Sequence, residues 1–461
     1  MTNVVLISTY ELGRQPFGLA SPAAWLREAG ASVTCLDLAV QQLEEKPVTA
    51  DDLVGFYVPM LTATRVAMAV VERVKRINPG AHLCFYGLYA PVNEELLRTL
   101  GAGTILGGEF EEGLVALVKR LSAGQNGAGI SPQVEPVLSL AKQKFLVPDR
   151  TGLPQLQQYA FLTRGDGRQQ PVGYTEASRG CKHLCRHCPV VPVYGGRFRV
   201  VQPDVVLEDI GRQVEAGAEH ITFGDPDFFN GPGHAVAIVE ALHRRWPKLT
   251  YDVTIKIEHL LDLAHHLPLL GDTGCLFVTS AVEAVHDHIL EIFDKRHTRA
   301  DFIQIVSLFR EVGLTLHPTF VTFTPWTALD AYLDLLRLIH ELELVENVSP
   351  IQYAIRLLIP AGSRLLELPE ARTLVGEFDE RALSYPWVHP DPRMDRLHGD
   401  LLQLVQESQD KNEPRHVTFG KVWEMALAAQ ESTSNGSRKL FALNGALPQK
   451  PVPFLSEPWY C

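Results

Sequence analysis

The chain has 461 residues, of which 46% are hydrophobic, and its formal net charge is -12. This size predicts about three domains with proper cores, and the acidic balance argues against nucleic acid, whose phosphates require a basic surface. The first residues enter a strand pattern directly, no uncharged stretch is long enough to span a bilayer, and seven cysteines fit a reducing compartment. We therefore expect a cytoplasmic protein that binds a small molecule and neither nucleic acid nor membrane.

Residues 1–121 alternate short apolar runs with helical patterns. The predicted strands are residues 4–8, 32–36, 53–57, 82–86 and 104–106. Five such units predict a doubly wound parallel sheet, a Rossmann-like domain whose ligand crevice lies at the carboxyl ends of the strands. Residues 122–170 begin with a glycine- and serine-rich stretch and are interpreted as a linker.

A second β/α series begins near residue 171. Its predicted strands are residues 172–176, 220–224, 250–257, 275–280, 315–323 and 351–358. Six units predict a partial parallel barrel over residues 171–362, with its chemistry in the loops that follow the strands. The pattern then becomes irregular, so residues 363–461 are predicted to form a small irregular C-terminal extension.

The loop after the first of these strands carries three cysteines at C-x3-C-x2-C spacing: Cys181, Cys185 and Cys188. Three thiolates suit three corners of an iron-sulfur cube, and the iron left without a protein ligand can bind a small molecule and pass it an electron. The alternative is a zinc ion completed by His183 or His187, but no second pair of ligands follows. The loop therefore favours redox chemistry.

Together with the six β/α units, this loop resembles the radical S-adenosylmethionine (SAM) superfamily over roughly residues 171–360. The resemblance implies a 4Fe-4S cluster on Cys181, Cys185 and Cys188, with the amino and carboxylate groups of SAM on the free iron. An electron from the cluster then breaks a carbon-sulfur bond of SAM, so a donor such as flavodoxin or ferredoxin is implied. His187 would pack near the adenine.

The same resemblance implies an acidic group beside the methionyl ammonium of SAM. Where the superfamily has a Gly-Gly-Glu-like motif after the second strand, this chain has Gly224-Asp-Pro-Asp227. Asp225 is the first candidate to accept hydrogen bonds from the ammonium, and Asp227 is the second.

Four further SAM contacts are implied at other strands of the barrel. Ser280 and Glu283, after the fourth strand, match a pattern that contacts the ribose and the methionyl end. Lys256 on the third strand and Arg356 on the sixth are basic groups for the carboxylate. The alternative for each is a surface ion pair or a hydrogen bond at the end of the sheet.

The first domain resembles the cobalamin-binding fold that precedes the barrel in one large class of these enzymes. Residues 104–111, Thr-Ile-Leu-Gly-Gly-Glu-Phe-Glu, are similar to its Gly-Glu-Gly-Glu-like end. No Asp-x-His-x-x-Gly motif supplies a histidine ligand for cobalt, and the large side chains of residues 86–91 stand where the family has small ones. The resemblance leaves cobalamin binding and a retained scaffold as alternatives.

Both ends of the chain resemble the CUAEP/CCAEP-tail radical SAM proteins, through residues 8–25 and the ending Glu-Pro-Trp-Tyr-Cys461. That family ends in Cys-Sec-Ala-Glu-Pro or Cys-Cys-Ala-Glu-Pro, so we expect the natural chain to continue past Cys461 through selenocysteine. The resemblance suggests a catalytic role for Cys461, whose thiol could hold a soft metalloid or resolve a redox intermediate. The alternative is a disordered tail with an incidental cysteine.

These features predict a radical SAM transferase that moves a SAM-derived carbon group to a small acceptor. One version transfers the 3-amino-3-carboxypropyl group directly, with trivalent arsenic as an acceptor that a soft ligand would hold. The other transfers methyl through cobalamin to a natural product or peptide. The alternative from another class is a non-catalytic iron-sulfur redox sensor, and the acidic balance disfavours modification of transfer RNA.

Overall fold

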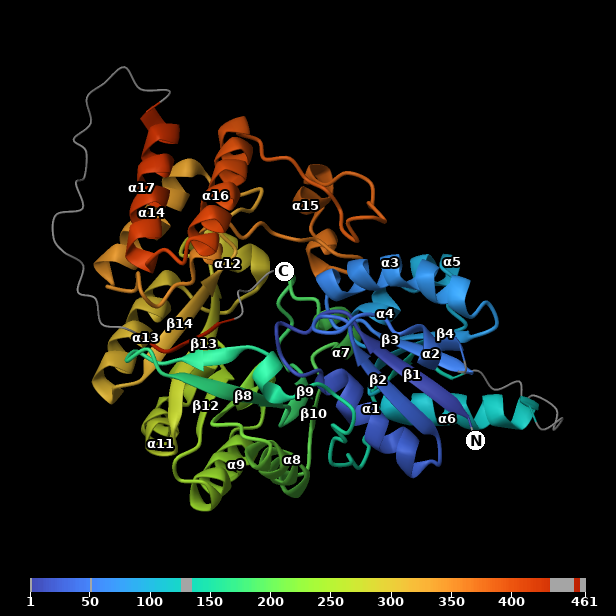
Figure 1. Ribbon diagram of the computed structural model, residues 1–461. Helices are drawn as coiled ribbons and strands as arrows, with labels where there is room; N and C mark the ends of the chain where they lie inside the picture. The colour runs from blue at the N-terminus through green and yellow to red at the C-terminus, as the bar shows by residue number, and fades with distance from the viewer. Residues whose placement is uncertain (1, 50–51, 126–134, 432–451, 457–461) are drawn as a thin grey trace.

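The computed structural model describes residues 2–49, 52–125, 135–431 and 452–456. They form two α/β lobes that lie side by side, the first in blue and the second in green to orange in Figure 1. The first lobe contains a six-stranded sheet and the second a seven-stranded sheet. The expected fold class, a doubly wound domain followed by a partial parallel barrel, is confirmed.

The first sheet is parallel throughout and has the strand order of a doubly wound fold. Its strands, in sheet order, are β2 (Ser32–Asp37), β1 (Asn3–Ser8), β3 (Leu53–Tyr57), β4 (His82–Tyr86), β5 (Thr104–Gly108) and β6 (Leu138–Ser139). The order reverses between β1 and β3, and sheets of this kind bind ligands outside the carboxyl ends of the strands at that point. The second lobe faces this edge.

Both faces of the first sheet are apolar, because successive strand residues point to opposite sides. Val4 and Leu6 pack in one core cluster, while Val5 and Ile7 pack in another. Figure 1 shows helices on both sides. They are α1 (Phe17–Glu28) and α6 (Glu111–Gln125) on one face, and α2 (Glu45–Thr49), α3 (Leu61–Ile77), α4 (Tyr89–Val92) and α5 (Glu94–Thr99) on the other.

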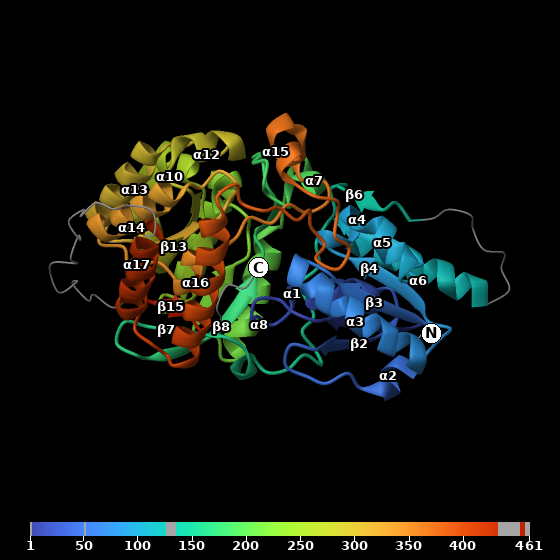
Figure 2. The same ribbon diagram turned by 90° about the horizontal axis from the view of Figure 1, so that it is seen from above.

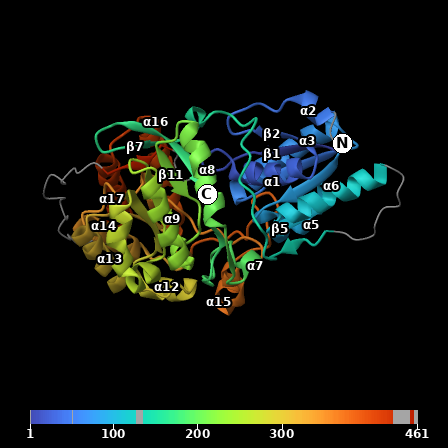
Figure 3. The ribbon, with the colours of Figure 1, turned by 90° about the horizontal axis from the view of Figure 1, so that it is seen from below.

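The second sheet is curled, with its helices arranged in an arc around the outside (Figures 2 and 3). Its strands, in sheet order, are β14 (Thr315–Phe320), β13 (Cys275–Glu283), β12 (Thr250–Thr254), β11 (His220–Phe223), β8 (Gln169–Thr175), β7 (Phe161–Thr163) and β15 (Phe454–Leu455). The first five are parallel, whereas β7 and β15 each run antiparallel to the preceding neighbour. The helices are α8 (Pro203–Glu215), α9 (Pro232–Arg245), α10 (Ile257–Asp262), α11 (Leu267–Asp272), α12 (Asp287–Phe293), α13 (Arg299–Val312) and α14 (Leu329–Glu341).

The sixth predicted strand, residues 351–358, does not form as a regular strand. Residues Pro350–Tyr353 form the 3-10 helix η4, and the sheet continues only through an isolated parallel bridge between Phe323 and Arg356. Proline cannot donate to a strand ladder, and the Gln352 side chain instead accepts the hydrogen bond of the Phe320 amide (2.8 Å). A side chain thus replaces the missing strand at the end of β14.

Two other regions differ from their predicted character. The expected linker supplies β6 to the first sheet and β7 to the second. The expected irregular extension contains α16 (Pro392–Asp410) and α17 (Arg415–Glu431), which pack on each other, and α17 also packs on α14. The remaining elements are η1 (Leu156–Gln158), β9 (Ser178–Gly180), α7 (Val191–Tyr194), β10 (Phe198–Val200), η2 (Phe228–Asn230), η3 (Ala264–His266), η5 (Arg364–Glu367) and α15 (Pro369–Leu374).

None of the helices in the described part of the chain combines the length and the apolar character that a membrane span requires.

Candidate functional site

The three cysteines lie on one loop that follows β9, at the carboxyl end of β8. The short strand β9 pairs antiparallel with β10 and closes the base of this loop. Asn230 fixes the beginning of the loop, because its Oδ1 accepts from the Lys182 amide (3.1 Å) and its Nδ2 donates to the Gly180 carbonyl (3.3 Å). The thiols are therefore presented from a braced loop at the end of the barrel where chemistry was expected.

The loop offers donors both for a cluster and for a single ion. Ligand atoms of Cys181, His183 and Asp227 all lie within 4.8 Å of one another, and two ligands of one zinc ion lie at most about 4.6 Å apart, which is twice a Zn–S bond. A single ion in this group would leave the thiols of Cys185 and Cys188 unused. An iron-sulfur cluster instead takes one thiolate at each of three corners, so it accounts for all three cysteines of the loop.

Burial in the loop disfavours the thiolate forms of two of the cysteines, Cys181 and Cys188. Burial is the main cause that raises the pKa of Cys181 to about 11 and that of Cys188 to about 12. Burial lowers the pKa of Lys295, but Glu283 and the thiols of Cys185 and Cys188 outweigh it and raise that pKa overall. Binding iron would therefore release protons, and the Lys295 ammonium would stabilise the resulting thiolates.

Glu283 connects the fourth barrel strand to the cysteine loop. It lies at a register shift between β13 and β14 and has a left-handed φ of 69°, a geometry that re-aims a side chain and is typical of functional sites. Its carboxylate lies 3.1 Å from His187 Nε2 and 3.4 Å from Lys295 Nζ. Burial raises the pKa of Glu283, but Lys295 and His187 outweigh it and lower the value to about 2.

The two aspartates of the Gly-Asp-Pro-Asp segment have different surroundings. Asp225 lines the central cavity of the barrel and also accepts from the Ala177 amide (2.8 Å) and the Ser178 hydroxyl (2.5 Å). Burial raises the pKa of Asp225 to about 7. Asp227 instead caps η2 and lies 2.7 Å from His259 Nδ1, so its carboxylate is already occupied by a buried histidine.

The other predicted SAM-binding residues are placed as follows. Lys256 Nζ lies 2.7 Å from Glu258 and 3.3 Å from His183 Nδ1, next to the cysteine loop. The Ser280 hydroxyl donates to a backbone carbonyl (2.7 Å) at the end of the sheet. Arg356 pairs with Asp395 (2.8 Å) in α16 and is not among the residues that line the cavity. Gly224 lines the cavity, and Cys461 lies outside the described residues.

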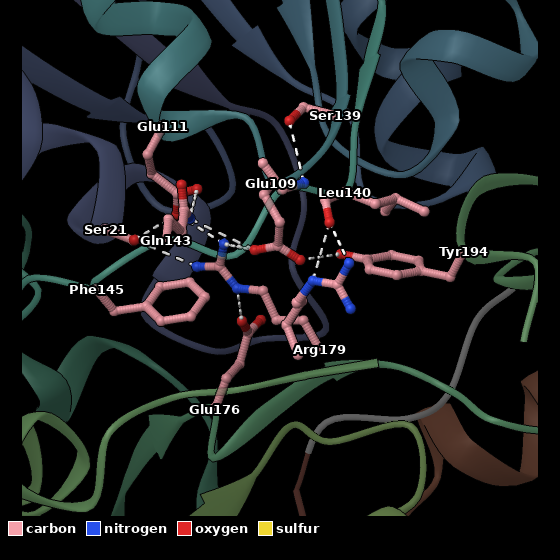
Figure 4. Close-up of polar contacts among 12 residues, drawn as sticks. Ser21, Glu109, Glu111, Ser139, Leu140, Gln143, Phe145, Glu176, Arg179 and Tyr194 are labelled. Atoms are coloured by element: carbon pink, nitrogen blue, oxygen red, sulfur yellow. Dashed lines mark hydrogen bonds and ion pairs between the residues drawn. The ribbon is translucent and has the colours of Figure 1, made fainter. Parts of the chain in front are cut away.

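A buried charged cluster that sequence reasoning did not predict joins the first lobe to the cysteine loop (Figure 4). The Arg179 guanidinium lies 2.7 Å from Glu176, 2.7 Å from Glu111 and 3.3 Å from Glu109, and all four side chains are largely buried. Arg179 precedes the first cysteine by two residues, while Glu109 and Glu111 belong to the Gly-Gly-Glu-Phe-Glu segment. The sequence contained both segments but gave no signal that they meet.

Two cavities lie along this junction. The larger, ≈ 480 Å³, lies inside the barrel at the strand ends and is closed on one side by residues 12–14 of the first lobe. The smaller, ≈ 190 Å³, lies between the carboxyl edge of the first sheet and the start of the cysteine loop. The larger is within the range of about 300–1,000 Å³ that drug-sized ligands occupy, and the smaller is below it.

Residues 175–336 match the family model described as the radical SAM superfamily. The barrel of this chain is therefore a radical SAM domain, whose defining cofactors are a 4Fe-4S cluster and SAM.

Known proteins resemble the chain well beyond this domain. The hopanoid C-3 methylase of Methylococcus capsulatus is 26% identical over 329 residues, which are 68% of this chain and 62% of the methylase. The chain thus spans less than two thirds of that relative. The match makes this chain a distant relative of an enzyme that is named as a methylase.

Two solved structures share its two-lobed fold. The radical SAM methyltransferase TsrM from Kitasatospora setae, solved with tryptophan and a SAM analogue, superposes with a TM-score of 0.58 at 18% identity, over 74% of this chain and 71% of TsrM. OxsB, a cobalamin-dependent SAM radical enzyme solved with aqua-cobalamin and SAM, gives a TM-score of 0.67 at 16% identity, over 89% of this chain and 67% of OxsB.

The crevice of the first sheet is closed by its own aromatic side chains. The Tyr57 and Tyr86 rings lie 5.4 Å apart and the Tyr86 and Phe110 rings 5.0 Å apart, and all three are buried. The Tyr86 hydroxyl donates to the Gly18 carbonyl (2.9 Å), and a Cβ on Gly18 would meet the Tyr57 ring at 2.1 Å. Cobalamin is larger than a drug-sized ligand, so the residues of this crevice do not fit it in this structure.

Proposed function

We propose that the protein is a radical SAM transferase that cleaves SAM reductively and transfers a SAM-derived carbon group to a small-molecule acceptor. The observation that carries this proposal is the placement of three thiols on one loop at the strand ends of a radical SAM domain. Cys181, Cys185 and Cys188 would hold a 4Fe-4S cluster, which supplies the electron when bound.

The residues around the loop and the cavity suit the parts of SAM. Asp225, on the cavity wall, would accept hydrogen bonds from the methionyl ammonium. Glu283, held ionised by Lys295 and His187, and Ser280 would contact the ribose and methionyl end. The Lys256 ammonium would pair with the carboxylate of SAM. The remaining volume of the cavity would hold the acceptor.

Different observations favour different identities for the transferred carbon group. The closed crevice of the first sheet favours direct transfer of the 3-amino-3-carboxypropyl group, because this version needs no cobalamin. The name of the hopanoid methylase and the cobalamin in the OxsB structure favour methyl transfer as the second candidate.

The acceptor is proposed to be held by a soft ligand. Phe454 and Leu455 of β15 line the cavity, and Cys461 follows Leu455 by six residues, a reach of at most about 22 Å in extended chain. A thiol within that reach would hold a soft metalloid such as trivalent arsenic. Cys461→Ser should then abolish carbon transfer to arsenite with unchanged iron content, and full transfer would remove this role.

The released nucleoside tests the function directly. The protein is reconstituted anaerobically with iron and sulfide and incubated with dithionite, SAM and arsenite, with and without hydroxocobalamin. Methylthioadenosine without cobalamin would support aminocarboxypropyl transfer, and S-adenosylhomocysteine that requires cobalamin would support methyl transfer. If neither of these products forms while the cluster is intact, the transferase proposal fails. Formation of 5'-deoxyadenosine alone would indicate that the enzyme abstracts hydrogen from its substrate. Release of no nucleoside at all would indicate a redox sensor.

A further inference from the structure

The loop between β1 and α1 reaches across to the barrel in a constrained conformation. Leu12 and Gly13 both have left-handed φ angles, 51° and 66°. This region is uncommon for a non-glycine residue and is energetically unfavourable unless the surroundings impose it. Such strain is typically retained where a side chain must be held in a particular place.

Hydrogen bonds to several parts of the chain hold this loop in position. The Arg14 amide donates to the Glu11 carbonyl (3.0 Å), and the Ala160 amide donates to the Gly13 carbonyl (2.8 Å). The Gln15 side chain donates to the Pro154 carbonyl (2.8 Å). Residues 154–160 and the loop therefore hold each other in place. Residues 11–15 of this loop, which lie over the cavity, are called the arm below.

The arm places the Arg14 guanidinium on the wall of the ≈ 480 Å³ cavity. Its Cζ lies 5.0 Å from the centre of the Tyr174 ring. Within the described ranges, no carboxylate lies within 4.0 Å of the Arg14 guanidinium and no side-chain hydrogen bond satisfies it. The nearby arginines differ, since Arg150 pairs with Asp209 (3.0 Å) and Arg179 with three glutamates.

Glu11, the acidic residue of the same arm, interacts electrostatically with Arg14 but forms no ion pair with it within the described ranges. Glu11 is buried, and burial is the main cause that raises its pKa well above the usual value, with Glu176 adding to the effect. Arg14 opposes this rise, but no ion pair joins the two side chains in the described ranges, so the N–H donors of the guanidinium remain open to a ligand. The planar guanidinium presents a fork of N–H donors that matches a carboxylate or another oxyanion.

We propose that Arg14 binds an anionic group, a carboxylate or an oxyanion, of the molecule that occupies the barrel cavity. The proposal rests on the proposed function, because that function puts SAM and an acceptor in this cavity. The anion belongs either to the acceptor or to the methionyl carboxylate of SAM, and both sources offer the same chemistry to the guanidinium.

Binding measurements on the cluster-reconstituted protein test the proposal without turnover. The probes are benzoate, its neutral isostere benzamide, and SAM. Ligand-observed NMR titrations follow benzoate and benzamide, and equilibrium dialysis follows SAM. The variants are Arg14→Met, Arg14→Lys and Arg65→Met, the last removing an exposed arginine of α3 in the same lobe. Circular dichroism checks that each variant is folded.

We expect benzoate to bind more tightly than benzamide, and Arg14→Met to weaken benzoate binding at least tenfold while Arg65→Met does not. Arg14→Lys should retain part of the affinity. Unchanged SAM affinity in Arg14→Met would assign the anion to the acceptor, and a tenfold loss would assign it to SAM. Benzoate and SAM affinities that are both unchanged in Arg14→Met and Arg14→Lys would overturn the proposal, even if the wild-type protein releases a nucleoside from SAM.

Discussion

At the scale of single residues, Glu283 shows how a backbone irregularity creates a site. In a regular strand this side chain would stand on one face of the sheet, but the register shift and the left-handed φ turn its carboxylate toward His187 and Lys295. The carboxylate thereby balances the Lys295 ammonium, which is buried and acts on the thiols of Cys185 and Cys188. Charge near a cluster is one of the main determinants of its reduction potential.

Glu283→Gln should therefore raise the reduction potential of the reconstituted cluster. The amide keeps the shape of the side chain but removes the negative charge, so the Lys295 ammonium favours the reduced cluster more strongly. We expect a shift on the order of tens of millivolts, measured by redox titration with EPR detection. Glu291→Gln, which changes an exposed glutamate of α12, should not shift the potential, and equal potentials for all three proteins would contradict this role of Glu283.

Glu109 gives a prediction about pH at the same scale. Burial raises the pKa of Glu109 from 4.5 to about 7, although Arg179 opposes it. The folded state therefore favours the protonated side chain, and this contribution to stability is present below about pH 4.5 and is lost as the pH rises through 7. Wild-type protein should lose stability relative to Glu109→Gln between pH 5 and pH 8, by up to about 3 kcal/mol.

Urea unfolding of the two proteins across this pH range measures the effect. Glu112→Gln is the matched control, because Glu112 is the neighbouring exposed glutamate at the start of α6. Its stability should follow the wild-type protein at every pH. Parallel curves for wild-type protein and Glu109→Gln would show that the Glu109 carboxyl has an ordinary pKa.

At the scale of elements, Arg179 joins the start of α6 to the turn between β8 and the cysteine loop. Its removal would leave three buried carboxylates without their shared cation, and breaking a buried ion pair costs about 3–5 kcal/mol. Arg179→Met should lower the melting temperature clearly. Arg212→Met, which removes a half-exposed ion pair in α8, should cost at most about 1 kcal/mol, and similar melting temperatures for both variants would contradict the account.

The sequence predicted most elements, because their periodicity is local. Five of the six parallel strands of the first lobe and all five parallel strands of the second follow from apolar runs, and the cysteine loop lies where the strand pattern placed it. The prediction of a sixth barrel strand was wrong. Residues Pro350–Tyr353 form a 3-10 helix, and the Gln352 side chain accepts the hydrogen bond of the Phe320 amide at the end of β14. The joining of Arg179 to Glu109 and Glu111 could not be predicted, since it depends on how two lobes pack.

At the scale of the whole molecule, the first lobe closes the barrel from one side. Its aromatic side chains fill the crevice of its own sheet, its glutamates hold Arg179, and residues 12–14 line the barrel cavity. The two lobes therefore build one site around the cysteine loop. The family resemblance predicted this pair of lobes, but packing decides which spaces between them stay open.

The central claim is that Cys181, Cys185 and Cys188 hold a 4Fe-4S cluster with one iron open to SAM. The most direct test is the EPR spectrum of the anaerobically reconstituted, dithionite-reduced protein, recorded with and without SAM. We predict the signal of a reduced 4Fe-4S cluster that changes on addition of SAM and is lost in the triple cysteine-to-alanine variant. A mononuclear metal with a complete set of side-chain ligands, or a cluster signal that SAM leaves unchanged, would contradict the claim.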